Sequence, residues 1–175
     1  MKELTIFGKQ YTLTEQKSNR DHIELQGNHV LVYKNKKTTK ALLKDFLSQL
    51  LYEKLHDISK NINTEGKIDI FGDLDFEITE NIDNKKQRIA KLKGNKILVK
   101  LKVVALPESA LEYIIAHETA HITSKQHTKR FWKAVKLICP DYEKAQGLLK
   151  EFGQVTTVRV RDLILVERSA ASLDE

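Results

Sequence analysis

The residues His117-Glu118-Thr119-Ala120-His121 constrain this chain more than any other feature of its sequence. In an α-helix four residues turn through roughly 400°, so His117 and His121 lie on one face, a turn apart. That spacing lets two imidazoles reach one metal ion. Glu118 lies about 100° round the helix from His117, where its carboxylate can address a water on the ion without binding the ion itself. Two nitrogen ligands and a water-polarising carboxylate are typical of a metal-activated hydrolase.

The residues around this motif favour a helix. Pro107 suits the first helical turn, where no N–H donor is needed. An apolar stripe that can pack the helix on a core consists of Leu111, Ile114, Ile115 and Ile122.

A third imidazole, His127, follows six residues after His121. It can reach the same ion only if the chain turns at about residues 123–126. Thr128 is then a suitable N-cap for a second helix, which ends before Pro140. Three nitrogen ligands with an open fourth position are typical of catalytic zinc, although other divalent ions also accept them. The alternative is that these are ordinary, partly buried histidines; the third histidine and the capped helix after it weigh against that reading.

Composition predicts a single domain with a substantial core, since the chain has 175 residues of which 41% are hydrophobic. No apolar run is long enough for a membrane span and no secretory segment is visible, so we expect a cytoplasmic protein with no membrane partner. The single cysteine, Cys139, lies in an apolar helical stretch and is expected to be a buried packing residue.

Positive charge is concentrated between Asp83 and Lys102, with eight basic residues against one acid. The ordinary interpretation is a solvated strand face. The functional interpretation is a surface at residues 85–102 that contacts a polyanion. No aromatic residues alternate with these charges, so stacking on single-stranded nucleic acid has little support.

The order of elements predicts an α+β fold. Hairpins are expected about Gly8-Lys9 and Gly27-Asn28, then a helix from its N-cap Thr38 to about Ile62. The later predicted elements are one or two strands in 67–79, a hairpin with arms 87–92 and 96–104, the two helices described above, a helix at about 141–152 and a strand at 157–166. We assign residues 1–168 to one domain, with a β-rich part (1–37), a catalytic core (38–153), a C-terminal strand (155–167) and a frayed tail (169–175).

This pattern resembles the YgjP-like metal-dependent hydrolases, a zincin-like group related to the WLM- and SprT-type proteases. The resemblance covers roughly residues 11–152, and its most specific stretches are Leu106-Pro107, Tyr113–His121, His127–Trp132 and Pro140–Tyr142. It implies a minimal metallopeptidase core, in which the helix with the two histidines lies beside a small antiparallel or mixed sheet, preceded by N-terminal β-hairpins. It also implies that His117, His121 and His127 bind the metal and that Glu118 is the catalytic base.

The sequence departs from that family at two segments. Arg88-Ile89-Ala90-Lys91 stands where the family usually has an Arg-Trp-Gly-Ser-like sequence, and Lys100 stands where it has an asparagine. The ligand spacing also fits the metzincins. We reject that group because Ser124 replaces its glycine and the only methionine is Met1, which leaves no residue for a Met-turn.

We therefore expect a zinc-dependent, metallopeptidase-like hydrolase that acts on a peptide or protein. If strand 96–104 borders the cleft, Lys96, Lys100 and Lys102 would contact an anionic substrate. Two alternatives stay open: a nucleoside triphosphate pyrophosphatase of UTP type on the same metal site, and a non-enzymatic module that binds metal or nucleic acid.

Overall fold

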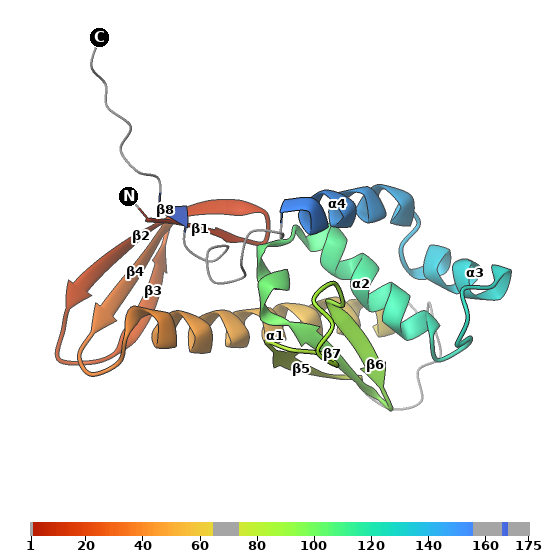
Figure 1. Ribbon diagram of the computed structural model, residues 1–175, viewed down its shortest axis with the longest axis horizontal. Helices are drawn as coiled ribbons and strands as arrows, with labels where there is room; N and C mark the ends of the chain where they lie inside the picture. The colour runs from red at the N-terminus through yellow and green to blue at the C-terminus, as the bar shows by residue number, and fades with distance from the viewer. Residues whose placement is uncertain (1, 65–73, 156–165, 168–175) are drawn as a thin grey trace, which may run out of the picture.

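The computed structural model describes residues 2–64, 74–155 and 166–167, and has the expected α+β architecture (Figure 1). A sheet at the N-terminal end and a smaller second sheet lie along one long helix, and three shorter helices cover the second half. In chain order the elements are β1 (Lys2–Ile6), β2 (Lys9–Lys17), β3 (His22–Gln26), β4 (His29–Lys34), α1 (Thr39–Thr64), β5 (Asp75–Thr79), β6 (Ala90–Lys93), β7 (Lys96–Lys100), the 3-10 helix η1 (Leu101–Ala105), α2 (Glu108–Ala120), α3 (Lys129–Ile138), α4 (Tyr142–Val155) and β8 (Val166–Glu167).

The N-terminal sheet contains both expected hairpins. Strands β1 and β2 pair antiparallel, as do β3 and β4, while β2 and β4 pair parallel, so the strand order is β3-β4-β2-β1-β8. The first turn has positive φ at Phe7 (48°) and Gly8 (76°), the conformation that tight hairpins favour. One face of this sheet supplies the buried side chains Leu4, Ile6, Leu13, Val30 and Val32.

Helix α1 connects this sheet to the rest of the molecule. Its N-cap is Thr38, as predicted, and the Thr38 hydroxyl accepts a hydrogen bond from the Ala41 N–H at 3.2 Å. Residues a turn apart bury one face of the helix: Leu43, Leu47, Leu51 and Leu55. At 26 residues the helix is about 39 Å long, long enough to pass beneath both sheets (Figure 1).

The second sheet has the order β5-β7-β6, so β7 is its central strand. Strand β5 runs parallel to β7, and β6 forms an antiparallel hairpin with it about Gly94-Asn95. Strand 67–79 was expected; residues 75–79 form β5, and residues 67–73 lie outside the described part.

The strand expected over 96–104 is shorter than predicted. It ends at Lys100, and Leu101–Ala105 form η1. Residues 101–104 are all buried, which a strand exposed on one face cannot achieve because its side chains alternate between faces.

The η1 helix is where the N-terminal sheet meets the core. The N–H groups of Phe7 and Gly8 donate to the carbonyl oxygens of Val104 and Ala105 at 2.8 and 3.1 Å. The turn between β1 and β2 therefore lies directly against the segment that leads into α2.

The C-terminal half agrees with the expected helices. Cys139 is buried as predicted. Of the expected C-terminal strand, residues 156–165 lie outside the described part, and Val166–Glu167 form β8 against β1. The tail at 169–175 also lies outside it. Among the described helices, none combines the length and apolar character needed to cross a bilayer.

Candidate metal centre

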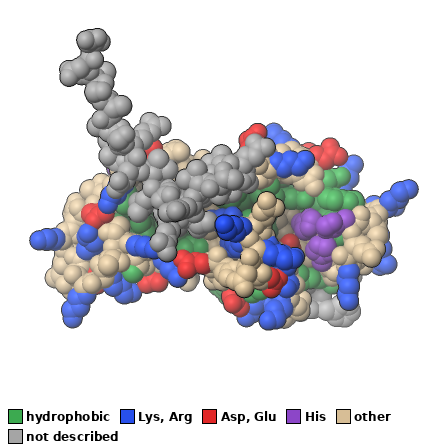
Figure 2. Space-filling view, viewed as in Figure 1, with side chains coloured by type: hydrophobic (Ala, Val, Ile, Leu, Met, Phe, Trp, Pro, Cys, Tyr) green, Lys and Arg blue, Asp and Glu red, His purple; other side chains and the backbone are tan. Residues whose placement is uncertain are grey.

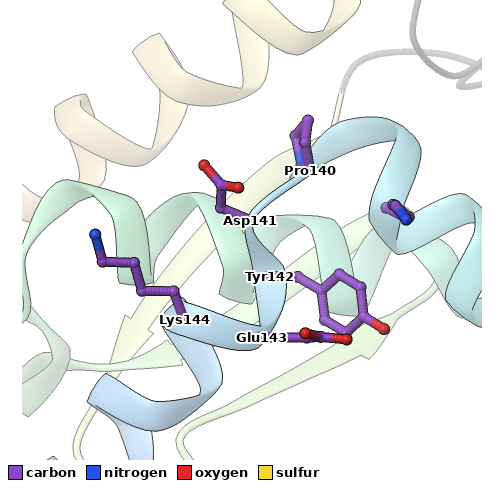
Figure 3. Close-up of a pocket in the computed structure, with 6 residues that line it drawn as sticks. Pro140, Asp141, Tyr142, Glu143 and Lys144 are labelled. Atoms are coloured by element: carbon purple, nitrogen blue, oxygen red, sulfur yellow. The ribbon is translucent and has the colours of Figure 1, made fainter.

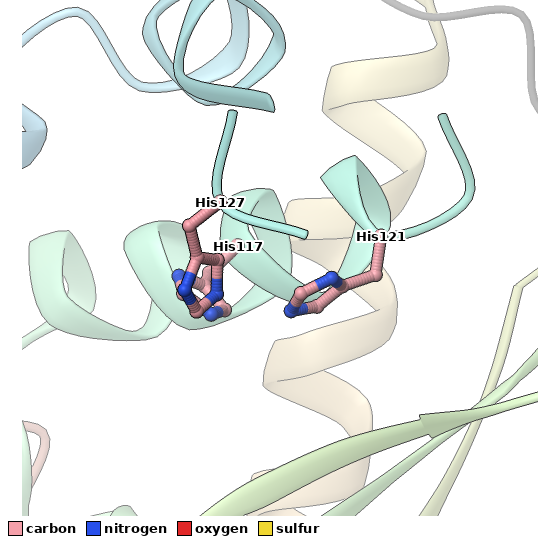
Figure 4. A group of neighbouring side chains, drawn as sticks. All are labelled: His117, His121 and His127. Atoms are coloured by element: carbon pink, nitrogen blue, oxygen red, sulfur yellow. The ribbon is translucent and has the colours of Figure 1, made fainter. Parts of the chain in front are cut away.

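His117, His121 and His127 converge at one end of α2 (Figure 4). Each offers one ring nitrogen to a group of atoms that all lie within 4.8 Å of one another. In tetrahedral coordination each histidine nitrogen lies about 2.0–2.1 Å from the metal, so the ligand nitrogens must also lie near one another. The three imidazoles are therefore placed to bind one divalent ion. His117 and His121 are half-buried and His127 is exposed.

A tight turn after α2 brings His127 back to the other two. The helix ends at Ala120, and its carbonyl oxygen accepts from the N–H groups of Thr123 and Ser124 at 3.0 and 3.1 Å. The Ser124 hydroxyl donates to the Gln126 carbonyl oxygen at 2.7 Å. The Thr128 side chain then caps α3 by accepting from the Phe131 N–H. The turn and the cap lie where the sequence placed them.

Two histidines are oriented by hydrogen bonds on the ring nitrogen Nδ1. His121 Nδ1 lies 3.2 Å from the Ser124 carbonyl oxygen. Because a carbonyl oxygen only accepts, this Nδ1 carries the proton and Nε2 is left to bind metal.

His117 contacts Tyr113, one turn earlier in α2, whose hydroxyl group can either accept from Nδ1–H or donate to Nδ1. Its Nδ1 lies 3.3 Å from the Tyr113 hydroxyl, which accepts from Gln146 Nε2 at 2.9 Å. Neither Tyr113 nor Gln146 was predicted from the sequence as a site residue. Tyr113, four residues before His117, could have been found from helical spacing, whereas Gln146 on α4 gives no sequence signal.

The three histidines pack against aromatic side chains. The ring of Phe131 is fully buried, with its centroid 4.7–5.0 Å from those of the three imidazoles. Trp132 stacks on Tyr142 at 5.3 Å. Burial, together with smaller contributions from charge on His121 and His127, lowers the pKa of His117 to about 4. His117 is therefore neutral near pH 7, the form that binds metal.

Glu118 connects the metal helix to the edge of the second sheet. Its Oε2 accepts a hydrogen bond from the backbone N–H of Leu92 on β6 at 2.8 Å. Burial raises the pKa of the Glu118 carboxyl group, opposed by the Leu92 N–H and by charge on His121 and Arg88. Leu92 was not a predicted site residue, because a backbone contact between distant segments leaves no mark on the sequence.

The three lysines expected at the substrate cleft make their contacts elsewhere. Lys96 pairs with Glu77 at 3.5 Å. Lys100 is 6% exposed and donates to the carbonyl oxygens of Lys85 and Lys86 at 2.6 and 3.2 Å. Lys102 is buried in η1, and this burial lowers its pKa. Strand β7 is the central strand of its sheet and β6 is the edge strand, which reaches Glu118 through Leu92. A substrate contact of the three lysines therefore stays a prediction that these contacts do not support.

Many residues of the basic run at 85–102 interact within the protein. Arg88 and Lys91 both pair with Asp83. Together with Lys96, Lys100 and Lys102, five of its eight basic residues are paired or buried.

A hollow of about 220 Å³ lies where α3 joins α4 (Figure 3). It is lined by Lys136, Pro140, Asp141, Tyr142, Glu143 and Lys144, with lysine and acid side chains in equal number. None of the three histidines lines it, so it is separate from the candidate metal centre.

Comparison with known proteins gives one family match. A family model described as YgjP-like, metallopeptidase domain, matches residues 1–152. Among solved structures, the chain is similar to the metallopeptidase zymogen of Pyrococcus abyssi abylysin. The two are 20% identical with a TM-score of 0.47, over 59% of this chain and 95% of that one. No curated protein matches the sequence significantly.

Proposed function

This chain belongs to the YgjP-like metallopeptidase family, and from that premise we propose that it hydrolyses peptide bonds with a divalent metal ion and Glu118 as general base. His117, His121 and His127 would hold the ion. The observation that carries the proposal is the convergence of three imidazoles beside a carboxylate that is already held by another group.

Zinc is the ion that this ligand set favours, since three neutral nitrogens leave one position open. Other divalent ions are compatible with the same ligands. When bound in such a site, the ion lowers the pKa of a coordinated water and polarises the substrate carbonyl group.

Glu118 is arranged to move the proton. Its Oε2 is occupied by the Leu92 N–H, so the other carboxylate oxygen is available to accept the proton of the attacking water. Burial raises the pKa of Glu118, which brings it closer to the working pH of a general base. The same oxygen can then deliver the proton to the leaving amine.

A peptide substrate suits the outer edge of β6 better than a nucleotide does. The N–H and C=O groups of Ala90 and the C=O group of Leu92 point away from β7, because the backbone groups of Ile89 and Lys91 face it. The Leu92 N–H is already bonded to Glu118. An extended peptide can add to such an edge by backbone hydrogen bonds. The basic run at 85–102 suits the nucleotide alternative, but Lys96 pairs with Glu77, Lys100 donates to backbone carbonyl oxygens, and Lys102 is buried.

The test compares the wild type with Glu118→Gln and a matched control, Glu108→Gln. Glu108 is on the same helix and 65% exposed. Metal content is measured first, then casein cleavage or self-cleavage, with and without chelator. We expect Glu118→Gln to retain metal and lose turnover, whereas Glu108→Gln retains both.

The alternatives give different results in the same assays. Phosphate release from UTP without peptide cleavage would replace the peptidase proposal with the pyrophosphatase. Metal binding or salt-sensitive DNA binding without any turnover would indicate the non-enzymatic module.

A further inference from the structure

Positive charge gathers at the N-terminal sheet rather than along the basic run at 85–102. Figure 2 shows lysine and arginine side chains distributed around that end of the molecule, far from the histidine cluster. Three lysines, at positions 34, 37 and 40, lie close together in the sequence, whereas Lys2 and Lys17 come from β1 and β2 and are brought beside them by the fold.

These lysines line a hollow of about 770 Å³ where β1, β2 and β4 meet the start of α1. Among the ten described residues that line it, half are lysines and one, Glu15, is acidic. The five lysines are Lys2, Lys17, Lys34, Lys37 and Lys40. Hydroxyl groups of Ser18, Thr38 and Thr39 add further hydrogen-bond donors.

Acidic side chains neutralise only part of this charge. Lys2 pairs with Glu15 at 3.0 Å, and Lys34 pairs with the other oxygen of the same carboxylate. Lys37 pairs with Asp45 at 3.0 Å. Asp21 accepts hydrogen bonds from the backbone N–H groups of Asn35 and Lys37, and it adds a third negative charge beside Lys37. Among the ion pairs of the described residues, none involves Lys17 or Lys40. Five ammonium groups thus outnumber the three carboxylates described beside them.

Glu15 shows that the donors of this hollow can converge on one anion. Hydrogen bonds from Lys34 and Lys2 lower the pKa of Glu15 to about 2, and the Thr39 hydroxyl contributes in the same direction. The carboxylate therefore holds two lysines beside the hollow with their ammonium groups close together.

We propose that this hollow binds a ligand with several adjacent phosphate groups, with Lys17 and Lys40 as the cations that pair with no carboxylate of the described residues. Ammonium and hydroxyl donors match phosphate oxygens. The described residues that line the hollow include no aromatic side chain, so recognition would fall on phosphates rather than on bases. The site is independent of the proposed hydrolase activity, because it shares no residue with the metal centre.

The test measures binding of inorganic tripolyphosphate and of a single-stranded oligonucleotide by calorimetry, each at low and moderate salt. The variant Lys17→Gln/Lys40→Gln removes two charges without breaking a described ion pair. The matched control, Lys85→Gln/Lys93→Gln, removes two exposed lysines of the basic run.

We expect the Lys17/Lys40 variant to bind at least roughly tenfold more weakly, because two charge-assisted hydrogen bonds are lost. For the oligonucleotide, the slope of log affinity against log salt concentration should become shallower by about 0.7 for each lysine removed. Glu15→Gln should bind more tightly, because it removes the competing carboxylate. The ligand whose binding changes in this way, tripolyphosphate or the oligonucleotide, shows which kind of molecule supplies the phosphate groups.

Two results would overturn the site. One is binding of neither ligand by the wild type. The other is an equal loss of affinity in the Lys85/Lys93 control, which would mean that net charge alone is sensed. Thermal melting of each variant shows that the comparison is made on folded protein.

Discussion

The backbone N–H of Leu92 donates a 2.8 Å hydrogen bond to Oε2 of Glu118. This bond connects the edge of the second sheet to the metal helix at the residue proposed to move the proton. The Leu92 N–H can reach Glu118 because it points away from β7, the partner strand of β6. It also fixes one oxygen of a partly buried carboxylate and leaves the other free.

Leu92→Pro should reduce turnover without disturbing the sheet. Proline is tolerated on an edge strand where the lost N–H points outward, so the β6–β7 ladder should persist. We expect kcat for the casein substrate to fall roughly tenfold, since general-base catalysis depends on positioning. KM and metal content should change little.

Ala90→Pro is the control for that variant. It removes another outward N–H from the same strand, and no hydrogen bond to Glu118 is lost. An equal fall in kcat for both variants would assign the effect to the strand, and an unchanged kcat for Leu92→Pro would remove Leu92 from the site.

Tyr113→Phe should weaken metal binding. The hydroxyl group lies 3.3 Å from His117 Nδ1 and is itself held by Gln146. Loss of such a partner typically lowers metal affinity about 10- to 100-fold. Affinity is measured by competition with a coloured chelator, beside the melting temperature of the metal-free protein.

Tyr52→Phe is a matched control, because it removes a hydroxyl that donates to Asp75 at 3.2 Å, away from the histidines. Equal metal affinity in Tyr113→Phe and the wild type would leave Tyr113 with a packing role only.

Much of the candidate site could be predicted because its signals are local. His117, Glu118 and His121 lie within one helical turn, and the Thr128 cap sets where α3 begins. The hairpins were also predictable, since a glycine with positive φ marks each turn.

The remaining features depend on contacts between distant segments. Alternation in 96–104 could not show that β7 would become a central strand, with Lys100 buried beneath the loop at residues 85–86. The parallel pairing of β2 with β4 joins strands that are not consecutive. The Leu92–Glu118 bond and the lysine-lined hollow arise from the same kind of contact.

Glu15 should make stability depend on pH in the acid range. Hydrogen bonds from Lys34 and Lys2 lower its pKa from 4.5 to about 2. A lowered folded-state pKa stabilises the fold fully above the ordinary value of 4.5, and this contribution is lost as the pH falls toward 2. The difference in unfolding free energy between wild type and Glu15→Gln should therefore shrink below about pH 4.5.

Urea unfolding at pH 7, 5, 4 and 3 measures that difference. Lys34→Gln should reduce the pH dependence as well, because it removes the partner with the largest effect. A constant difference across this range would mean that Glu15 is not held by these lysines in solution.

Gly8→Ala should destabilise the joint between the N-terminal sheet and the core. Gly8 has φ +76°, and a Cβ there would lie 3.1 Å from Pro107 Cβ and 3.3 Å from its Cα. Left-handed backbone costs an alanine about 1–2 kcal/mol, and the contact with Pro107 adds to that cost. Gly27→Ala separates the two effects, because Gly27 has φ +59° with nothing within 4 Å. We expect Gly8→Ala to lower the melting temperature more, since 1 kcal/mol corresponds to roughly 2–4 °C at this size. Equal losses in the two variants would mean that Pro107 moves aside freely, and that the turn does not fix the segment entering α2.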